Sequence, residues 1–363
     1  MAIDHHHDSS AYTGGQAVND AVDRAAPEAI AADDQKLKRH ARLAGLLRKG
    51  LQRFVGNVAS VLTSEDRRAI HDLRVCSRRV QQILVATYGE TLPRRARAIR
   101  RRMRRTRRAV GEWRSYDVVI AMLESRLQRA RDDDHRRAWS IVLKCAEQAR
   151  HREIRRARRR LTRLNVFGIK DTGALLIESG ASRHLPTDTA SRNAIAKAHD
   201  RWCEAYATAE SGRAEDIHAF RIRTKGLRYR IELARELGTA DTKPLIEWFK
   251  KLQDDLGRWR DRIELARIIA SSIADPERLL TESRASIILL TELERILKRA
   301  GGEIQRQLDA ARLSPGFAQC NAWVRLYVSQ VASPQADNEA GEGTETISTD
   351  ASPPIVAQNE RES

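Results

Sequence analysis

Two short stretches of the chain match each other 147 residues apart: residues 71–79 read HDLRVCSRR, and residues 218–226 read HAFRIRTKG. Each places a histidine, an arginine and a second cation at positions i, i+3 and i+7. On an α-helix these positions lie within about 60° of one another. Cationic neighbours at such spacing destabilise an isolated helix. A stripe of this kind that occurs twice therefore predicts a helix face that binds an anion.

The match continues on both sides of these stretches and predicts a tandem repeat. Duplication explains the shared register better than chance, because histidine, glycine, tryptophan and basic positions all recur. At an offset of 147 or 146 residues the matching pairs are His71 and His218, Arg74 and Arg221, Arg78 and Lys225, Arg137 and Arg284, Arg104 and Lys250, Gly111 and Gly257, Trp113 and Trp259, and Arg114 and Arg260.

Apolar residues spaced three and four apart predict long amphipathic helices throughout the repeats. The fold class expected is all-α, with four helices in each copy. The first copy spans about 38–164, with its third helix at 93–127 and its fourth at 134–164. A stretch rich in glycine and proline, 165–189, predicts a linker. The second copy, about 190–331, has expected helices at 191–210, 215–237, 244–271 and 276–311, and a short further helix at 318–331.

Charge divides the chain into a basic body and two acidic ends. Residues 1–35 and 333–363 each hold seven acidic residues against a single arginine, and both are expected to be disordered. The body between them, 36–332, retains 64 basic and 35 acidic residues, a formal net charge of +29. Such a body repels itself unless an anionic partner neutralises it.

Several classes of protein fit the sequence poorly. The longest apolar run, 287–290, is far too short to span a membrane, and the polar N-terminus does not resemble a signal peptide. The four cysteines are widely spaced and predict reduced thiols in a cytoplasmic protein. We expect no membrane partner, no cofactor, no metal site and no catalytic residues.

A second recurring element has the form Gly-x-Trp-Arg and follows each His-containing stretch. Gly111 and Gly257 predict a bend or a close approach between helices. Trp113 and Trp259 are expected to pack in the core rather than to stack on bases. Most other arginines of the run 100–108 are assigned to an outer basic face, because they do not recur in the second copy.

Together these elements resemble the CHAD domain (conserved histidine α-helical domain), over about residues 38–330. The resemblance implies two up-down four-helix bundles related by a pseudo-two-fold axis, with their basic helices lining a central groove. It also implies binding of inorganic polyphosphate and a place at polyphosphate granules. The residues that match by position are His71, Arg74, Arg78, Arg104, Arg114, His218, Arg221, Lys225, Arg228, Lys250 and Arg260. Gln81 stands where the second copy has Arg228, and Ser115 where it has Asp261.

Two other functions remain open. The arginine-rich runs 100–108 and 152–160 would attract any phosphate backbone, so non-specific binding of RNA or DNA is the first alternative. A phosphoanhydride hydrolase is less favoured, because we find neither a phosphate-binding loop nor a carboxylate cluster suited to Mg²⁺. Histidines beside arginines further predict tighter binding at mildly acid pH.

Overall fold

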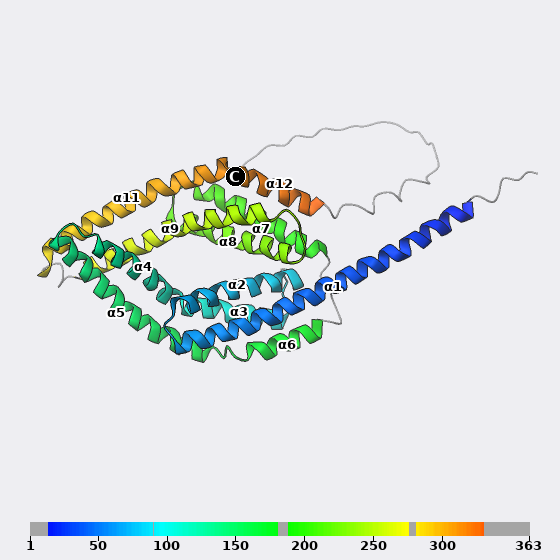
Figure 1. The fold of residues 1–363 in the computed structure, drawn as a ribbon, viewed down its shortest axis with the longest axis horizontal. Coiled ribbons are helices and arrows are strands. Elements are labelled where there is room, and N and C mark those ends of the chain that lie inside the picture. Colours follow the sequence, from blue (N-terminus) through cyan, green and yellow to red (C-terminus); the bar gives the residue numbers. More distant parts are fainter. Residues whose placement is uncertain (1–13, 90, 181–187, 276–280, 330–363) are drawn as a thin grey trace, which may run out of the picture. The chain divides into compact units, whose positions relative to one another are not determined.

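The computed structural model describes residues 14–89, 91–180, 188–275 and 281–329. The chain divides after Val328 into two compact units, and the helices described here make up the first. Every regular element in the described residues is a helix (Figure 1), which confirms the all-α fold class. No described helix is long and apolar enough to cross a membrane.

The first half of the chain packs around one hydrophobic core. Its largest buried side chains include Phe54 on α1, Ile70 on α2 and Trp113 on α4. Buried residues from α1, α6 and the C-terminal half of α5 complete this core. The helices are α1 Gly14–Thr63, α2 Arg67–Tyr88, α3 Arg94–Ala109, α4 Gly111–Gln128, α5 Asp133–Arg163 and α6 Ile169–Gly180.

The second half packs around a separate core that is rich in aromatic rings. Trp202 on α7 lies at its centre, 5.9 Å from the ring of Phe220 and 5.7 Å from that of Phe249. The Trp202 indole also donates a hydrogen bond to the buried Thr224 hydroxyl at 3.1 Å. The helices are α7 Asp188–Ala209, α8 Ala214–Glu236, α9 Lys243–Ile273, α11 Ser283–Leu313 and α12 Pro315–Ser329.

A third core joins the two halves. It is made by α4 and α5 from the first half and by α9 and α11 from the second, with buried residues such as Val119, Trp139, Ile269 and Leu289. α4 packs on α9, and α5 packs on both α9 and α11. The two halves therefore share a core in addition to the one that each half has of its own. The duplication and the pseudo-two-fold axis stay predictions.

The helix boundaries differ from the expected ones in three places. Helix α1 already covers residues 14–35, where the sequence predicted disorder, because alanine-rich sequence favours a helix. The expected helix 93–127 is divided at Val110, where the backbone leaves helical geometry. The expected linker 165–189 contains α6, which packs on α1 and α3. The predicted disorder at 1–13 and 333–363 lies outside the described residues.

The two recurring glycines lie in different local structures. Gly111 begins α4 directly after the break at Val110, which confirms a bend. α9 continues through Gly257 without interruption. A side chain at either position would meet no atom within 4 Å, so the prediction of close helix approach is wrong for both.

Local hydrogen bonds fix where the site-bearing helices begin. The Asp66 carboxylate accepts a hydrogen bond from the Arg68 backbone amide at 2.8 Å and caps α2. Asp132 caps α5 in the same way through the His135 amide, also at 2.8 Å. The first of these caps lies at the start of α2, the helix that carries the first His-containing stripe.

Candidate functional site

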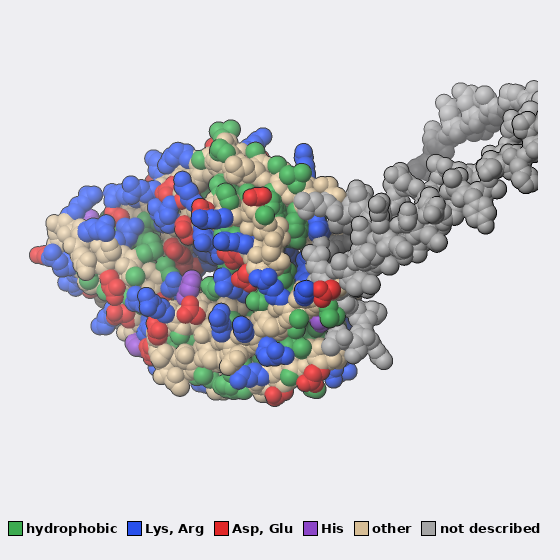
Figure 2. All heavy atoms as spheres, turned by 45° about the vertical axis from the view of Figure 1, so that its right-hand side comes forward, with side chains coloured by type: hydrophobic (Ala, Val, Ile, Leu, Met, Phe, Trp, Pro, Cys, Tyr) green, Lys and Arg blue, Asp and Glu red, His purple; other side chains and the backbone are tan. Residues whose placement is uncertain are grey.

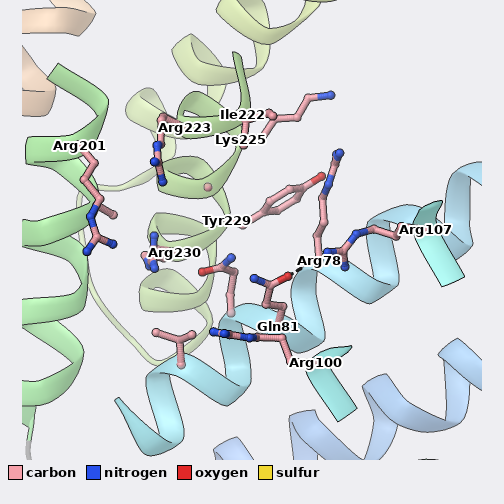
Figure 3. Close-up of a pocket in the computed structure, with 14 residues that line it drawn as sticks. Arg78, Gln81, Arg100, Arg107, Arg201, Ile222, Arg223, Lys225, Tyr229 and Arg230 are labelled. Atoms are coloured by element: carbon pink, nitrogen blue, oxygen red, sulfur yellow. Dashed lines mark hydrogen bonds between the residues drawn. The ribbon is translucent and has the colours of Figure 1, made fainter. Parts of the chain in front are cut away.

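A cavity of about 520 Å³ opens where α2 and α3 of the first half meet α7 and α8 of the second. Its lining is unusually basic. Figure 3 shows Arg201 on α7 facing Arg223 and Arg230 on α8, with Arg100 and Gln81 opposite them. The other charged side chains that line it are Arg78, Arg107 and Lys225.

Arg74 and Arg107 are half-buried cations at this site, and Arg107 lines the cavity. Burial, followed by the charge of Arg78, lowers the pKa of Arg74 to about 10. Further contributions to Arg74 come from Arg107, Arg221 and Arg114. Burial and then Arg78 and Arg104 lower the pKa of Arg107 to about 10. Guanidinium groups normally keep their protons at any accessible pH, so these shifts reflect first the burial of both groups and then the positive charges beside them.

The second half supplies the other side of the same group of charges. Burial and the charge of Arg78 lower the pKa of Arg221. Burial, followed by Arg221, Arg78, Arg74 and Arg228, lowers the pKa of Lys225 to about 6. Thus α2 and α8 bring their cations close enough for each to disfavour the charge of the other.

We call Arg74, Arg78, Arg107, Arg114, Arg221, Lys225 and Arg260 the central basic cluster. Arg260 has a carboxylate partner, since it forms an ion pair with Glu264 at 2.8 Å. The other six members make no ion pair with any described carboxylate. Asp261 is close enough to interact with four of the cations: burial raises its pKa, and Arg221, Arg114, Lys225 and Arg260 oppose that shift. The cluster therefore carries a positive charge that the described residues do not neutralise.

One face of the molecule is rich in basic side chains (Figure 2). Figure 2 shows Lys and Arg side chains over much of one face, with a shaded hollow near the middle of that face. In the described part of the chain, no three His, Cys, Asp or Glu side chains come close enough to hold a metal ion. What this arrangement offers chemically is a concentration of hydrogen-bond donors with positive charge, which suits phosphate oxygens.

Comparison with known proteins places the chain in a family. The family model for the CHAD domain matches residues 45–270, which include α2, α4, α8 and most of α9. The chain belongs to the CHAD domain family. This confirms the resemblance inferred from the repeated His and Gly-x-Trp-Arg elements.

Two solved structures share the CHAD fold of this chain. The CHAD domain from the plant Ricinus communis is 22% identical with a TM-score of 0.56, and the match covers 78% of this chain and 91% of that one. PptA from Streptomyces chartreusis is 19% identical with a TM-score of 0.56, covering 74% of this chain and 99% of that one. No curated protein matches the chain.

The structure of this chain brings together most of the first-half residues predicted from the sequence. Arg74, Arg78 and Arg114 belong to the central basic cluster. Arg104 lies close enough to lower the pKa of Arg107. His71, in contrast, is exposed and makes no hydrogen bond or ion pair with the described residues.

The second-half residues divide in a similar way. Arg221, Lys225 and Arg260 belong to the cluster, and Arg228 acts on Lys225 although its guanidinium pairs with Glu232 at 3.4 Å. Partial burial of its ring, followed by the charges of Arg260, Arg221 and Lys225, lowers the pKa of His218. Lys250 is exposed and has no bond or ion pair with the described residues, so the structure does not connect it to the cluster.

Arg107 is the member of the central basic cluster that was not predicted from the sequence as a site residue. Its guanidinium donates hydrogen bonds to the Ser77 hydroxyl at 3.2 Å and to the Gln81 side-chain oxygen at 3.1 Å. Gln81 thus holds a cation in the half where it replaces the arginine of the other copy. Arg107 was assigned to the outer face because it does not recur, but its seven-residue spacing from Arg100 places both on one helix face.

A second basic cavity, of about 760 Å³, lies between α4, α5 and α11. Arg114 lines it and also acts on Arg74, so the cavity adjoins the central basic cluster. Its other arginines were not predicted as site residues: Arg67, Arg126, Arg129, Arg131, Arg295 and Arg299. Glu292 neutralises part of this charge through ion pairs with Arg126, at 3.6 Å, and Arg295.

The acidic residues near the site act as structural partners where contacts exist. The buried Asp117 carboxylate accepts a hydrogen bond from Arg150 at 2.7 Å, and Arg150 also pairs with Glu65 at 2.9 Å. Asp255 pairs with Arg258. Asp117 and Asp255 are therefore ion-pair partners of arginines.

Proposed function

We propose that this chain binds inorganic polyphosphate at the central basic cluster without transforming it. The observation that carries the proposal is the set of cluster cations that lie partly buried and have no carboxylate partner. Burying unpaired charge costs free energy. A site that retains it in both halves of the chain is best explained by a ligand that supplies the missing negative charge.

The chemistry of polyphosphate fits the composition of the site. Each phosphate unit carries about one negative charge and several oxygens that accept hydrogen bonds. Arginine offers paired donors to such oxygens, whereas lysine offers a compact charge. The cavity has few aromatic rings, since Tyr229 is the one that lines it. This favours a ligand without bases over RNA or DNA.

Family membership gives the proposal independent support. Some members of the CHAD family bind polyphosphate, which agrees with the charge and the donors of the cluster. A location at polyphosphate granules in the cytoplasm is part of the same proposal. A hydrolase is the less favoured alternative, because no catalytic constellation has been assigned to the cluster.

Competition with RNA tests the proposal directly. Labelled polyphosphate of defined length is bound to the full chain, and unlabelled polyphosphate or RNA is added as the competitor. At equal phosphate concentration, RNA is expected to compete at least tenfold more weakly than polyphosphate. The measurement is fluorescence anisotropy with labelled polyphosphate at about 0.15 M salt, where non-specific phosphate contacts are weakened. Equal competition by RNA would favour generic backbone binding through the exposed arginines of α5.

Binding is also expected to weaken as pH rises above about 6. The free Lys225 amine loses its proton near that pH, and a bound polyanion would raise its pKa again, so the complex takes up a proton. One proton taken up corresponds to as much as a tenfold loss of affinity per pH unit. Below pH 6 Lys225 is already protonated in the free protein, so a further fall in pH adds no affinity through this residue. The charged groups that face it are Arg74, Arg78, Arg221, Arg228, His218 and Asp261.

Calorimetry between pH 5.5 and 8, with Lys225→Arg as the matched variant, checks this dependence. Arginine keeps its charge over the whole range, so the variant should show a flatter profile than the native chain. An identical profile would assign the pH dependence to other groups, such as His218 or the terminal phosphates. The stability of the free protein depends on pH in the opposite direction. Between pH 6 and 10.5 Lys225 is protonated in the unfolded chain but not in the folded one. Its contribution to the free energy of unfolding therefore rises with pH in that range.

A further inference from the structure

Lys225 lies half-buried on α8 among several other cations of that helix. It lines the 520 Å³ cavity, and it forms no hydrogen bond or ion pair with any described residue. Arg228, one turn further along α8, pairs with Glu232 at 3.4 Å. Figure 3 shows the Lys225 and Arg78 side chains reaching toward the same space from opposite halves of the chain.

The surroundings of this amine favour its neutral form. Burial, followed by the positive charges of Arg221, Arg78, Arg74 and Arg228, brings its pKa to about 6. A lysine attacks carbonyl groups only when it is unprotonated, and neighbouring cations are a known way to keep it so near neutral pH. Asp261 and His218 are the other titratable groups close to it.

The same arginines would hold a phosphate group beside the amine. We propose that Lys225 is a modification site whose side chain is acylated by small acyl phosphates that enter the cavity. In an acyl phosphate the phosphate is one bond from the carbonyl carbon. Guanidinium groups that bind the phosphate would therefore place that carbon next to the amine, and such positioning accelerates attack.

The reaction transfers the acyl group and releases inorganic phosphate. The Lys225 nitrogen forms a bond to the carbonyl carbon, the bond from that carbon to the phosphate oxygen breaks, and phosphate leaves with the electron pair. The amine gives up a proton to water. The product is a neutral amide, so the cavity permanently loses the charge that Lys225 would regain on binding a polyanion. Acylation and polyanion binding should then exclude each other.

The test is the rate of acetylation of the full chain by acetyl phosphate at pH 7, measured at each lysine by peptide mass spectrometry. We expect Lys225 to react at least tenfold faster than the exposed Lys250 and Lys251, which serve as internal controls. Its rate should level off above about pH 7, while the rates of the controls continue to rise to pH 9. A rate at Lys225 no higher than that at Lys250 would overturn the inference.

A charge-neutral reagent separates phosphate recognition from a reactive amine. In Arg78→Gln, the ratio of the Lys225 rate with acetyl phosphate to its rate with an uncharged acetyl ester should fall at least fivefold. An unchanged ratio would show that the phosphate is not recognised. This inference does not depend on polyphosphate being the ligand. If polyphosphate fails to bind but Lys225 is acetylated rapidly, only the proposed function is wrong. If polyphosphate binds but Lys225 is not acetylated faster than the controls, only the acylation proposal is wrong.

Discussion

Replacing Arg74 and Arg221 together with glutamine is expected to weaken polyphosphate binding by about two to four orders of magnitude. Each arginine lies half-buried in the central basic cluster and forms no ion pair with a described carboxylate. A charge-assisted hydrogen bond contributes about 1.5–3 kcal/mol, so the loss of two amounts to about 3–6 kcal/mol. Titration calorimetry with short polyphosphate at about 0.15 M salt measures this loss.

The same variant should make the free protein more stable. Burial and mutual repulsion disfavour both guanidinium charges, so their removal is expected to raise the free energy of unfolding by about 1 kcal/mol, or ~2 °C in Tm. Arg101→Gln with Arg105→Gln removes equal charge from exposed positions on α3 and should change affinity less than tenfold. If both double variants lose the same affinity, total charge and not the cluster controls binding.

Trp113→Ala should cost about 3–5 kcal/mol of the free energy of unfolding. The side chain is fully buried in the core of the first half, and truncation of such a tryptophan leaves a large cavity. Because most domains are stable by only about 5–15 kcal/mol, this change removes much of the total. Arg114 follows directly on α4, so affinity for polyphosphate should fall as well.

Urea denaturation followed by circular dichroism measures this effect, with Leu313→Ala as the matched control. Leu313 is 83% exposed, and its truncation should alter stability by no more than about 0.5 kcal/mol. A loss below about 1 kcal/mol for Trp113→Ala would mean that the α4 contact is not central to the core of the first half.

The sequence predicted those features that depend on periodicity and repetition. The His-containing stripes lie on α2 and α8, and these helices pack against each other. Trp113 and Trp259 are buried as expected. These predictions succeed because helix faces follow from spacing alone, and because a pair of matching basic stripes is costly unless the two meet at a site.

Features that depend on tertiary contacts were not predicted from the sequence. Nothing in the spacing of Arg107 shows that Ser77 and Gln81 hold it inside the site. The core shared by α4, α5, α9 and α11 has apolar residues that would suit separate bundles equally well. His71 has the right register but remains exposed, since register fixes a direction and not the depth of a side chain.

The most direct test of polyphosphate binding between the halves is a crystal structure of the complex with a short polyphosphate. The central claim is that one ligand contacts cations from α2 and α8 at once. Phosphate oxygens are then expected within hydrogen-bond distance of both Arg78 and Lys225. Density for the ligand along the exposed arginines of α5, with none at Arg78 or Lys225, would contradict it.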